Sequence, residues 1–155
     1  DLVEWQIDEG SNALVPCGTT GEAATLSTEE HRRVIEITVE AARGRVPVIA
    51  GCGSNSTAHA IELTRAAKEA GADAALHVPP YYNRPNQEGI HAHLAAVADL
   101  GIQIILYNVP ARTIRDIAVE TMARRSRLPN IIGDKHAPGN LGRVSDQRRA
   151  CGASG

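Results

Sequence analysis

Lys135 is the residue in this sequence best suited to covalent chemistry, because it stands just after a short apolar run at 131–133 that predicts the end of a strand. Only Lys68 and Lys135 are lysines, whereas arginine supplies the other 14 of the 16 basic residues. A lysine amine held partly out of water becomes a nucleophile that can form a Schiff base with a carbonyl compound. A solvated surface lysine is the alternative, but the strand-end position and the rarity of lysine favour a reactive amine.

The segment CGTTGE follows another apolar run and offers backbone groups that suit a small anion. Gly18 and Gly21 bracket Thr19 and Thr20. N–H groups in such a turn can converge on a carboxylate. A glycine-rich turn that only leads into a helix is the alternative, and this segment alone does not decide between the two.

Two further strand ends carry aromatic and basic side chains. PPYYN places Tyr81 and Tyr82 side by side, and adjacent side chains on extended backbone point in opposite directions, so at most one faces a given site. YNVPART places Tyr107 at the end of a strand and Arg112 in the loop beyond it. A guanidinium there could hold a substrate carboxylate through two hydrogen bonds.

The histidines do not predict a metal site. His91 and His93 are two residues apart on a predicted helix and so do not share a face, which favours a solvated helix surface over a metal site. His77 interrupts an apolar strand and is interpreted as a core or interface histidine with a hydrogen-bond partner.

Composition excludes several classes of protein. The net charge of -2 and the pI near 6.3 give no electrostatic basis for binding nucleic acid. No apolar stretch approaches the ~18 residues of a membrane span, and no signal peptide is recognisable. Cys17, Cys52 and Cys151 form no CxxC pair, so we expect small buried or half-buried thiols in a reducing cytoplasm. Phe is absent, so the core must be mainly aliphatic.

Short β-branched runs alternate with longer amphipathic segments along the chain. The predicted strands lie at 13–15, 46–50, 74–78, 102–106 and 130–132, spaced mostly by about 28 residues. The predicted helices lie at 2–9, 27–44, 58–70, 86–100 and 116–125, and a last one begins near 139–141. Ser27 and Glu30 form a capping box at the start of one of them.

The alternation predicts an α/β fold with a parallel sheet covered by helices. An open doubly wound sheet and part of an eight-stranded barrel both fit this pattern. No GxGxxG follows the first strand, and the polar motifs all stand at the carboxyl ends of strands, which favours the barrel. We therefore predict a partial TIM (β/α)8 barrel of about five β/α units, with 1–155 as a single truncated domain.

The motifs in combination resemble dihydrodipicolinate synthase. GTTGE, PYYNRP, YNVPART and a lysine after NIIG, followed by GNLGRV, occur in that order and spacing over essentially the whole chain. The wider superfamily includes N-acetylneuraminate lyase and other pyruvate-dependent aldolases. Thr19 and Arg112 favour the synthase, because the neuraminate lyases typically have serine at the first position and lack the Arg-Thr pair.

The resemblance implies a role for each matching catalytic residue. Lys135 matches the lysine that forms an imine with pyruvate, and Tyr107 matches the tyrosine above it that relays protons. Thr19 links Tyr107 to a second tyrosine, matched by Tyr82, which in the family reaches in from a neighbouring subunit. Thr20 and nearby amides, with Gly18, match the site for the pyruvate carboxylate.

The implied activity is a lyase reaction of lysine and diaminopimelate biosynthesis. The enamine of pyruvate attacks aspartate semialdehyde, whose carboxylate matches Arg112 at the entrance, and neither a metal nor an organic cofactor is required. The expected partners are these two small molecules and further copies of the chain, as a dimer or tetramer, but no nucleic acid and no membrane. A sister aldolase of the N-acetylneuraminate lyase or keto-deoxy-sugar-acid type, and a catalytically silent barrel fragment, are the alternatives.

The chain departs from the family pattern around the lysine and in its extent. Asp134, His136 and Pro138 stand where the family usually has an aliphatic residue, an acid and a threonine. Alternation along a strand predicts that Lys135 points into the barrel, while Asp134 and His136 point toward the helices and partly compensate each other. Measured against the family, the chain matches the second to sixth strands and resembles a fragment.

Overall fold

The computed structural model describes residues 1–152, in which helices and strands alternate along most of the chain. The strands are β1 (Ile49–Gly51), β2 (Ala74–His77), β3 (Gln103–Asn108) and β4 (Ile131–His136). The helices are α1 (Leu2–Asp8), α2 (Thr28–Ala42), α3 (Thr57–Glu69), α4 (Gln87–Ala98), α5 (Pro110–Thr113), α6 (Val119–Arg125) and α7 (Gly142–Cys151), with one 3-10 turn, η1 (Ala23–Thr25).

The strands form one parallel sheet in the order β1-β2-β3-β4, as predicted for consecutive β/α units. The first predicted strand, at 13–15, is wrong in extent, because it is reduced to an isolated parallel bridge between Leu14 and Val48. The Leu14 N–H donates to the Pro47 carbonyl at 2.9 Å. The next donor in a parallel ladder would be residue 16, but Pro16 has no N–H, so it pairs only through its carbonyl, which accepts from the Gly51 N–H at 2.9 Å.

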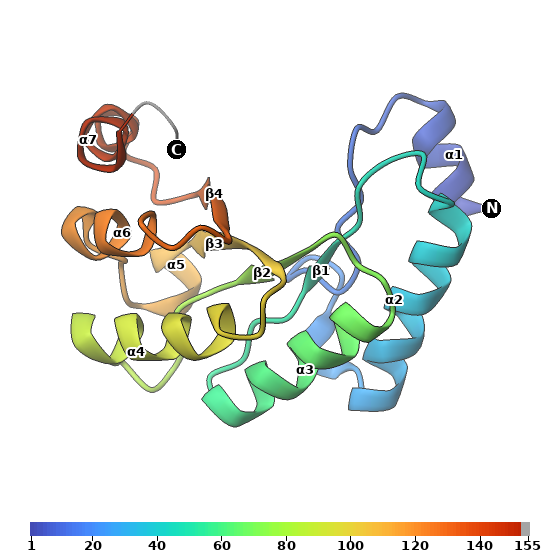
Figure 1. Cartoon of the computed structure of the whole chain (residues 1–155), viewed down its shortest axis with the longest axis horizontal. Helices are drawn as coiled ribbons and strands as arrows, with labels where there is room; N and C mark the ends of the chain where they lie inside the picture. Colours follow the sequence, from blue (N-terminus) through green and yellow to red (C-terminus); the bar gives the residue numbers. More distant parts are fainter. Residues whose placement is uncertain (153–155) are drawn as a thin grey trace.

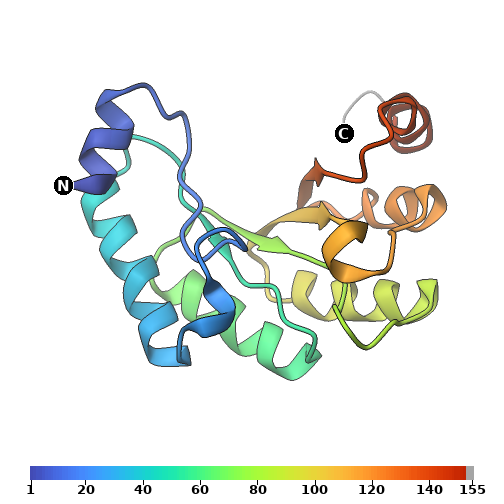
Figure 2. The same ribbon diagram turned by 180° about the vertical axis from the view of Figure 1, so that it is seen from behind.

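The sheet is an arc with helices around its outside (Figures 1 and 2). Its side chains alternate between two clusters, as expected for a barrel wall. Ala75, Ile104 and Leu106 pack outward into the main core, with Ile35, Ile90 and Leu94 of the helices. Leu76, Tyr107 and Val109 form a smaller cluster on the other face. The arrangement confirms the partial barrel, and its inner face carries Tyr107.

Helix α2 begins at the predicted capping box. The Glu30 N–H donates to the Ser27 hydroxyl at 3.2 Å, and the Ser27 N–H donates to the Glu30 carboxylate at 2.8 Å. These hydrogen bonds hold the pKa of the Glu30 carboxyl below its usual value. The helix ends at Ala42, just before the predicted stop at Gly44.

The region after β3 differs from the prediction of one helix at 116–125. The short helix α5 comes first, and α6 begins only at Val119. Asn108 at the end of β3 explains the delay: its side chain donates to Asp116 at 2.8 Å and accepts from the Ile117 N–H at 3.1 Å. These contacts hold residues 116 and 117 in a non-helical conformation.

The predicted solvated surface at His91 and His93 is wrong for His93. His93 is buried against α3, where its Nδ1 is 2.9 Å from the Thr57 hydroxyl. His77 is confirmed as a core histidine, fully buried with its Nε2 at 3.0 Å from the Thr64 hydroxyl. Within residues 1–152 no three His, Cys, Asp or Glu side chains gather to hold a metal ion.

The three cysteines are confirmed as free thiols, with Cys17 and Cys52 buried and Cys151 half-buried. Burial raises the pKa of Cys17 to about 11 and that of Cys52 to about 12, so both remain protonated and inert. None of the helices within residues 1–152 has the length and apolarity needed to cross a bilayer.

Ile114 is expected to be a strained position whose replacement by glycine stabilises the chain by about 1 kcal/mol. It caps α5 with φ +63°, a left-handed conformation that disfavours a β-branched residue, and it is 56% exposed, so little packing is lost. The free energy of unfolding in urea measures the effect. Ile114→Ala, which keeps the Cβ, is the control and should give no comparable gain.

Candidate functional site

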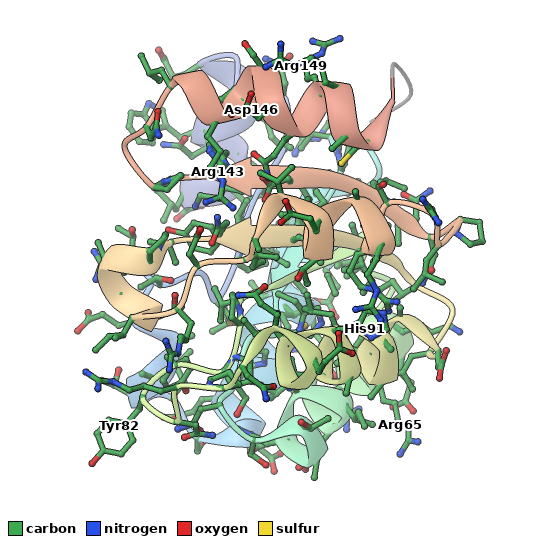
Figure 3. All side chains as sticks on the ribbon, turned by 90° about the vertical axis from the view of Figure 1, so that its left-hand side faces the viewer. Arg65, Tyr82, His91, Arg143, Asp146 and Arg149 are labelled. Carbon is green, nitrogen blue, oxygen red and sulfur yellow. The ribbon has the colours of Figure 1, made fainter. Side chains whose placement is uncertain are left out.

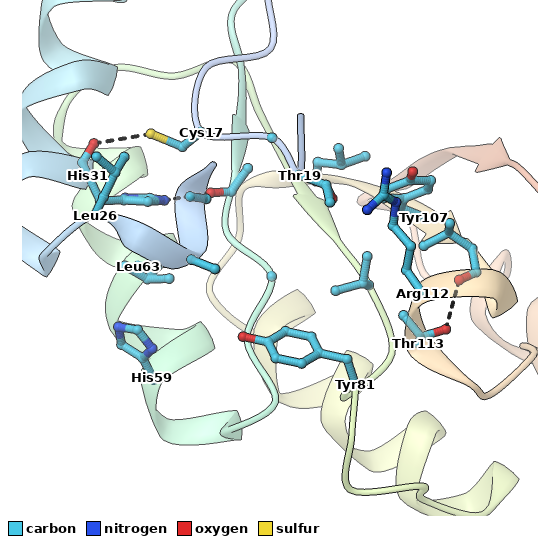
Figure 4. Close-up of a pocket in the computed structure, with 18 of the residues that line it drawn as sticks. Cys17, Thr19, Leu26, His31, His59, Leu63, Tyr81, Tyr107, Arg112 and Thr113 are labelled. Atoms are coloured by element: carbon cyan, nitrogen blue, oxygen red, sulfur yellow. Dashed lines mark hydrogen bonds between the residues drawn. The ribbon is translucent and has the colours of Figure 1, made fainter. Parts of the chain in front are cut away.

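A pocket of about 360 Å³ opens beside the carboxyl ends of the strands and joins four of the predicted site residues. Gly18, Thr19, Tyr107 and Arg112 line it, together with Tyr81 (Figure 4). In a parallel α/β sheet this edge is where ligands bind, because the loops that follow the strands converge there. Thr20, Tyr82 and Lys135 are not among its lining residues.

Lys135 lies directly against Tyr107. The two residues are paired across β3 and β4, and the Lys135 Nζ is 4.2 Å from the centre of the Tyr107 ring. Tyr107 is buried in the inner cluster, so the predicted inward direction of Lys135 is confirmed. A cation this close to an aromatic face is attracted to it, which gives the lysine a defined position.

The outward side of β4 carries the two unusual neighbours of Lys135. His136 Nδ1 is 3.2 Å from the Asp134 carboxylate, and Gln147 of α7 donates to the same carboxylate oxygen at 3.3 Å. The expected compensation between Asp134 and His136 is therefore confirmed. Burial still raises the pKa of Asp134 above its usual value, although His136 and Gln147 oppose this rise.

Thr19 and Thr20 stand on a tight loop between the Leu14 bridge and η1. The loop enters with Cys17 in a left-handed conformation, φ +56°, and the Glu22 N–H closes a turn onto the Thr19 carbonyl at 3.1 Å. Thr19 lies on the side of the pocket that holds Tyr107 and Arg112 (Figure 4). Thr20 is exposed.

Arg112 is presented by α5 rather than by an irregular loop. Pro110 occupies the first turn of this helix, where its missing N–H costs nothing. The Thr113 hydroxyl bonds to the Val109 carbonyl at 3.1 Å and to the Arg115 carbonyl at 2.8 Å, which closes the turn. Arg112 itself is exposed at the pocket mouth, where a guanidinium is free to meet an incoming anion.

Only one of the two adjacent tyrosines faces the pocket, as predicted. Tyr81 lines it, whereas Tyr82 has φ +70°, is 85% exposed and points away from the molecule (Figure 3). Asn83 ties this loop to the neighbouring one by donating to the Asn55 carbonyl at 2.7 Å. The exposed direction of Tyr82 is therefore held by the backbone.

Two histidines of the pocket escaped the sequence analysis. His59 of α3 is exposed, and its Nδ1 is 3.2 Å from the Ser54 hydroxyl. His31 of α2 is buried, and its Nε2 is 2.7 Å from the Gly51 carbonyl. Burial lowers the pKa of His31, so it stays neutral. Neither histidine lies in a strand-end motif, so only the packing of α2 and α3 on the sheet shows that both line the pocket.

Comparison with known proteins agrees with this geometry. A family model described as the Dihydrodipicolinate synthetase family matches residues 1–154. The 4-hydroxy-tetrahydrodipicolinate synthase of Parvibaculum lavamentivorans is 62% identical over 153 residues, which are 98% of this chain and 53% of that protein. The chain spans about half the length of the curated relatives it matches.

Solved structures show that the similarity includes the fold. The dihydrodipicolinate synthase of Aquifex aeolicus superposes with a TM-score of 0.96 at 47% identity, covering 99% of this chain and 53% of that one. The chloride-inhibited dihydrodipicolinate synthase of Acinetobacter baumannii, complexed with pyruvate, gives 0.94 at 52% identity, covering 97% and 52%. These are barrel enzymes of which the chain matches one half. Sequence, fold and site thus agree that this chain belongs to the dihydrodipicolinate synthetase family.

Proposed function

We propose that this chain, a single truncated barrel domain over 1–155, is the Schiff-base-forming part of a 4-hydroxy-tetrahydrodipicolinate synthase. The observation that carries the proposal is the Lys135 amine held 4.2 Å above the Tyr107 ring, beside a pocket that also holds Thr19 and Arg112. The reaction is the condensation of pyruvate with aspartate semialdehyde. Curated relatives that are 62% and 63% identical to this chain carry the name of this activity.

Imine formation begins when the amine of Lys135 attacks the ketone carbon of pyruvate. Loss of water requires protons to reach the departing oxygen. Tyr107, whose ring centre is 4.2 Å from the Lys135 Nζ, carries a hydroxyl that can donate and accept them. A phenol and a Thr19 hydroxyl can pass protons without adding charge to the site. Loss of a methyl proton from the imine then gives the enamine, which attacks the aldehyde carbon.

The two carboxylates need separate partners. The backbone around Gly18 and Thr20 would take the carboxylate of pyruvate, because a turn rich in free N–H groups suits an anion. Arg112 at the pocket mouth would take the carboxylate of the semialdehyde. Gly18 and Arg112 line the same pocket as Tyr107, so both carboxylates could be held near the Lys135 amine.

Tyr82 completes the relay only if a second copy of the chain supplies it. Its side chain is 85% exposed and points away from the molecule, and it does not line the pocket of its own chain. We propose that it reaches into the pocket of a neighbouring copy in a dimer or tetramer.

Free Cys17, Cys52 and Cys151 are consistent with a cytoplasmic protein, where thiols stay reduced.

Trapping with borohydride tests the proposal directly. Pyruvate with sodium borohydride is expected to attach one three-carbon unit to Lys135, because the hydride reduces the imine irreversibly. Peptide mass mapping locates the adduct. Lys68 is an internal control, since its Nζ is exposed and bonded to the Leu100 carbonyl, away from the pocket.

A folded chain that forms no adduct would contradict both the synthase and the sister aldolases. Circular dichroism establishes the fold, and Lys135→Arg shows the background. If the adduct forms, adding aspartate semialdehyde or an N-acylated amino-sugar aldehyde before the borohydride separates the two enzyme classes. Aspartate semialdehyde should be the one that lowers the yield of the pyruvate adduct, since it consumes the enamine.

A further inference from the structure

The loop that carries Thr19 and Thr20 passes unusually close to β1. A Cβ placed on Gly51 would stand 2.0 Å from the Cys17 carbonyl oxygen, 2.6 Å from its carbon and 3.0 Å from the Gly18 nitrogen. No side chain other than hydrogen fits such a contact, since all three atoms belong to backbone. Gly51 is therefore required by the approach of the loop, whereas its own φ needs no glycine.

Hydrogen bonds tie the same region together from both sides. The Gly51 N–H donates to the Pro16 carbonyl at 2.9 Å, immediately before the loop. On the other side His31 Nε2 lies 2.7 Å from the Gly51 carbonyl, and the Cys17 thiol donates to the His31 carbonyl at 3.5 Å. A carbonyl only accepts, so Nε2 carries the hydrogen of the neutral ring.

The geometry of the loop depends on these contacts. Cys17 has φ +56°, which an L-residue adopts only when its surroundings compensate the cost. Cys17 and His31 are both buried, so water does not replace the contacts if they are lost. Thr19 follows two residues after this strained position, and its place beside Tyr107 depends on the path set at Cys17.

We propose that Gly51 and His31 are positioning residues for the carboxylate-binding loop. Gly51 lets the Cys17 backbone lie against β1, and His31 holds the Gly51 carbonyl and the Cys17 thiol in place. Together they set where Thr19 and Thr20 stand relative to Lys135. The catalytic consequence rests on the function proposed above, but the positioning of the loop does not.

Gly51→Ala is expected to displace the loop and weaken pyruvate capture. The added Cβ forces the Cys17 carbonyl to retreat by about 1 Å, and a misplacement of this size can cost roughly 100-fold in rate. The pyruvate concentration that half-saturates borohydride trapping at Lys135 should rise by about that factor, more than the maximal trapping rate falls. Gly133→Ala is the matched control, since its Cβ would meet nothing within 4 Å.

His31 provides a second variant that leaves the backbone of β1 untouched. His31→Gln keeps an N–H donor for the Gly51 carbonyl and is expected to retain half-saturation within about threefold of the wild type. His31→Leu fills the space without the donor, and half-saturation should rise about tenfold. Rescue by glutamine but not leucine is a result that loss of packing alone would not give.

Amide NMR of the ligand-free chain separates this proposal from the proposed function. Gly51→Ala and His31→Leu should shift the signals of Gly18, Thr19 and Thr20, while Gly133→Ala and His31→Gln should not. Unmoved loop signals in Gly51→Ala would overturn the positioning role even if trapping succeeds. If the wild type forms no adduct, the proposed function is wrong. The NMR comparison still tests whether Gly51 and His31 position the loop.

Discussion

Tyr107→Phe should slow formation of the pyruvate adduct at Lys135 by about 1,000-fold, which is within the usual range for a group that transfers protons. The substitution removes only the hydroxyl group of the side chain. The ring is buried against Leu76 and Val109, and its face lies 4.2 Å from the Lys135 Nζ, so the lysine keeps its position. Single-turnover trapping at saturating pyruvate, followed by mass spectrometry, measures the rate.

Tyr81→Phe is the matched control for the loss of a hydroxyl in the same pocket. Tyr81 lines the pocket, whereas the ring that lies against the Lys135 Nζ is that of Tyr107, so we expect an effect below about tenfold for Tyr81→Phe. Equal effects of the two substitutions would show that general pocket polarity matters and that Tyr107 is not the relay. A Tyr107→Phe rate within a few-fold of the wild type would equally remove Tyr107 from the mechanism.

Acid should destabilise the chain well above the pH at which its carboxylates titrate, because two histidines are buried in neutral form. Burial lowers the pKa of His77 to about 3 and that of His93 to about 4, from an ordinary value of 6.5. The unfolded chain binds protons at these histidines below pH 6.5, whereas the folded chain does not. Stability is therefore full above pH 6.5 and falls as the pH drops toward the folded values.

The expected loss is about 2 kcal/mol for each histidine at about pH 5, or roughly 4 kcal/mol together. Urea unfolding followed by circular dichroism between about pH 7 and pH 5 measures it. His77→Leu should remove about half of the slope with little other cost, because the Thr64 hydroxyl still donates to the Ala60 carbonyl at 2.6 Å. His59→Gln, on an exposed histidine, should leave the slope unchanged.

A flat profile of unfolding free energy over this interval would show that water reaches the two histidine rings, either in the folded chain or in an unfolding intermediate that exposes them. Unpartnered ring nitrogens make the expected slope steep: His77 Nδ1 and His93 Nε2 are both buried without a hydrogen-bond partner in residues 1–152. Protonation would place a further buried N–H at each of these positions. A slope that His77→Leu does not change would assign the acid sensitivity to other groups.

Local signals in the sequence predicted most of the helices and strands. The short apolar runs that alternate with amphipathic segments located β1 to β4. Ser27 and Glu30 located the start of α2 because a capping box acts within four residues. The isolated bridge at Leu14 and the delayed start of α6 escaped prediction, since each depends on a partner distant in sequence or on Asn108 of β3.

The features of the candidate site were likewise predicted only in part from the sequence, and the structure revealed the rest. The sequence by itself predicted the chemistry proposed here, because the motifs around Lys135, Tyr107 and Arg112 match those of the family. Alternation along β4 also predicted that Lys135 points inward. Only the tertiary structure decided which tyrosine of the pair faces the pocket, that His93 is buried and that His31 bonds to the Gly51 carbonyl. These outcomes depend on φ angles and on contacts between elements 20 or more residues apart, for which a linear pattern carries no signal.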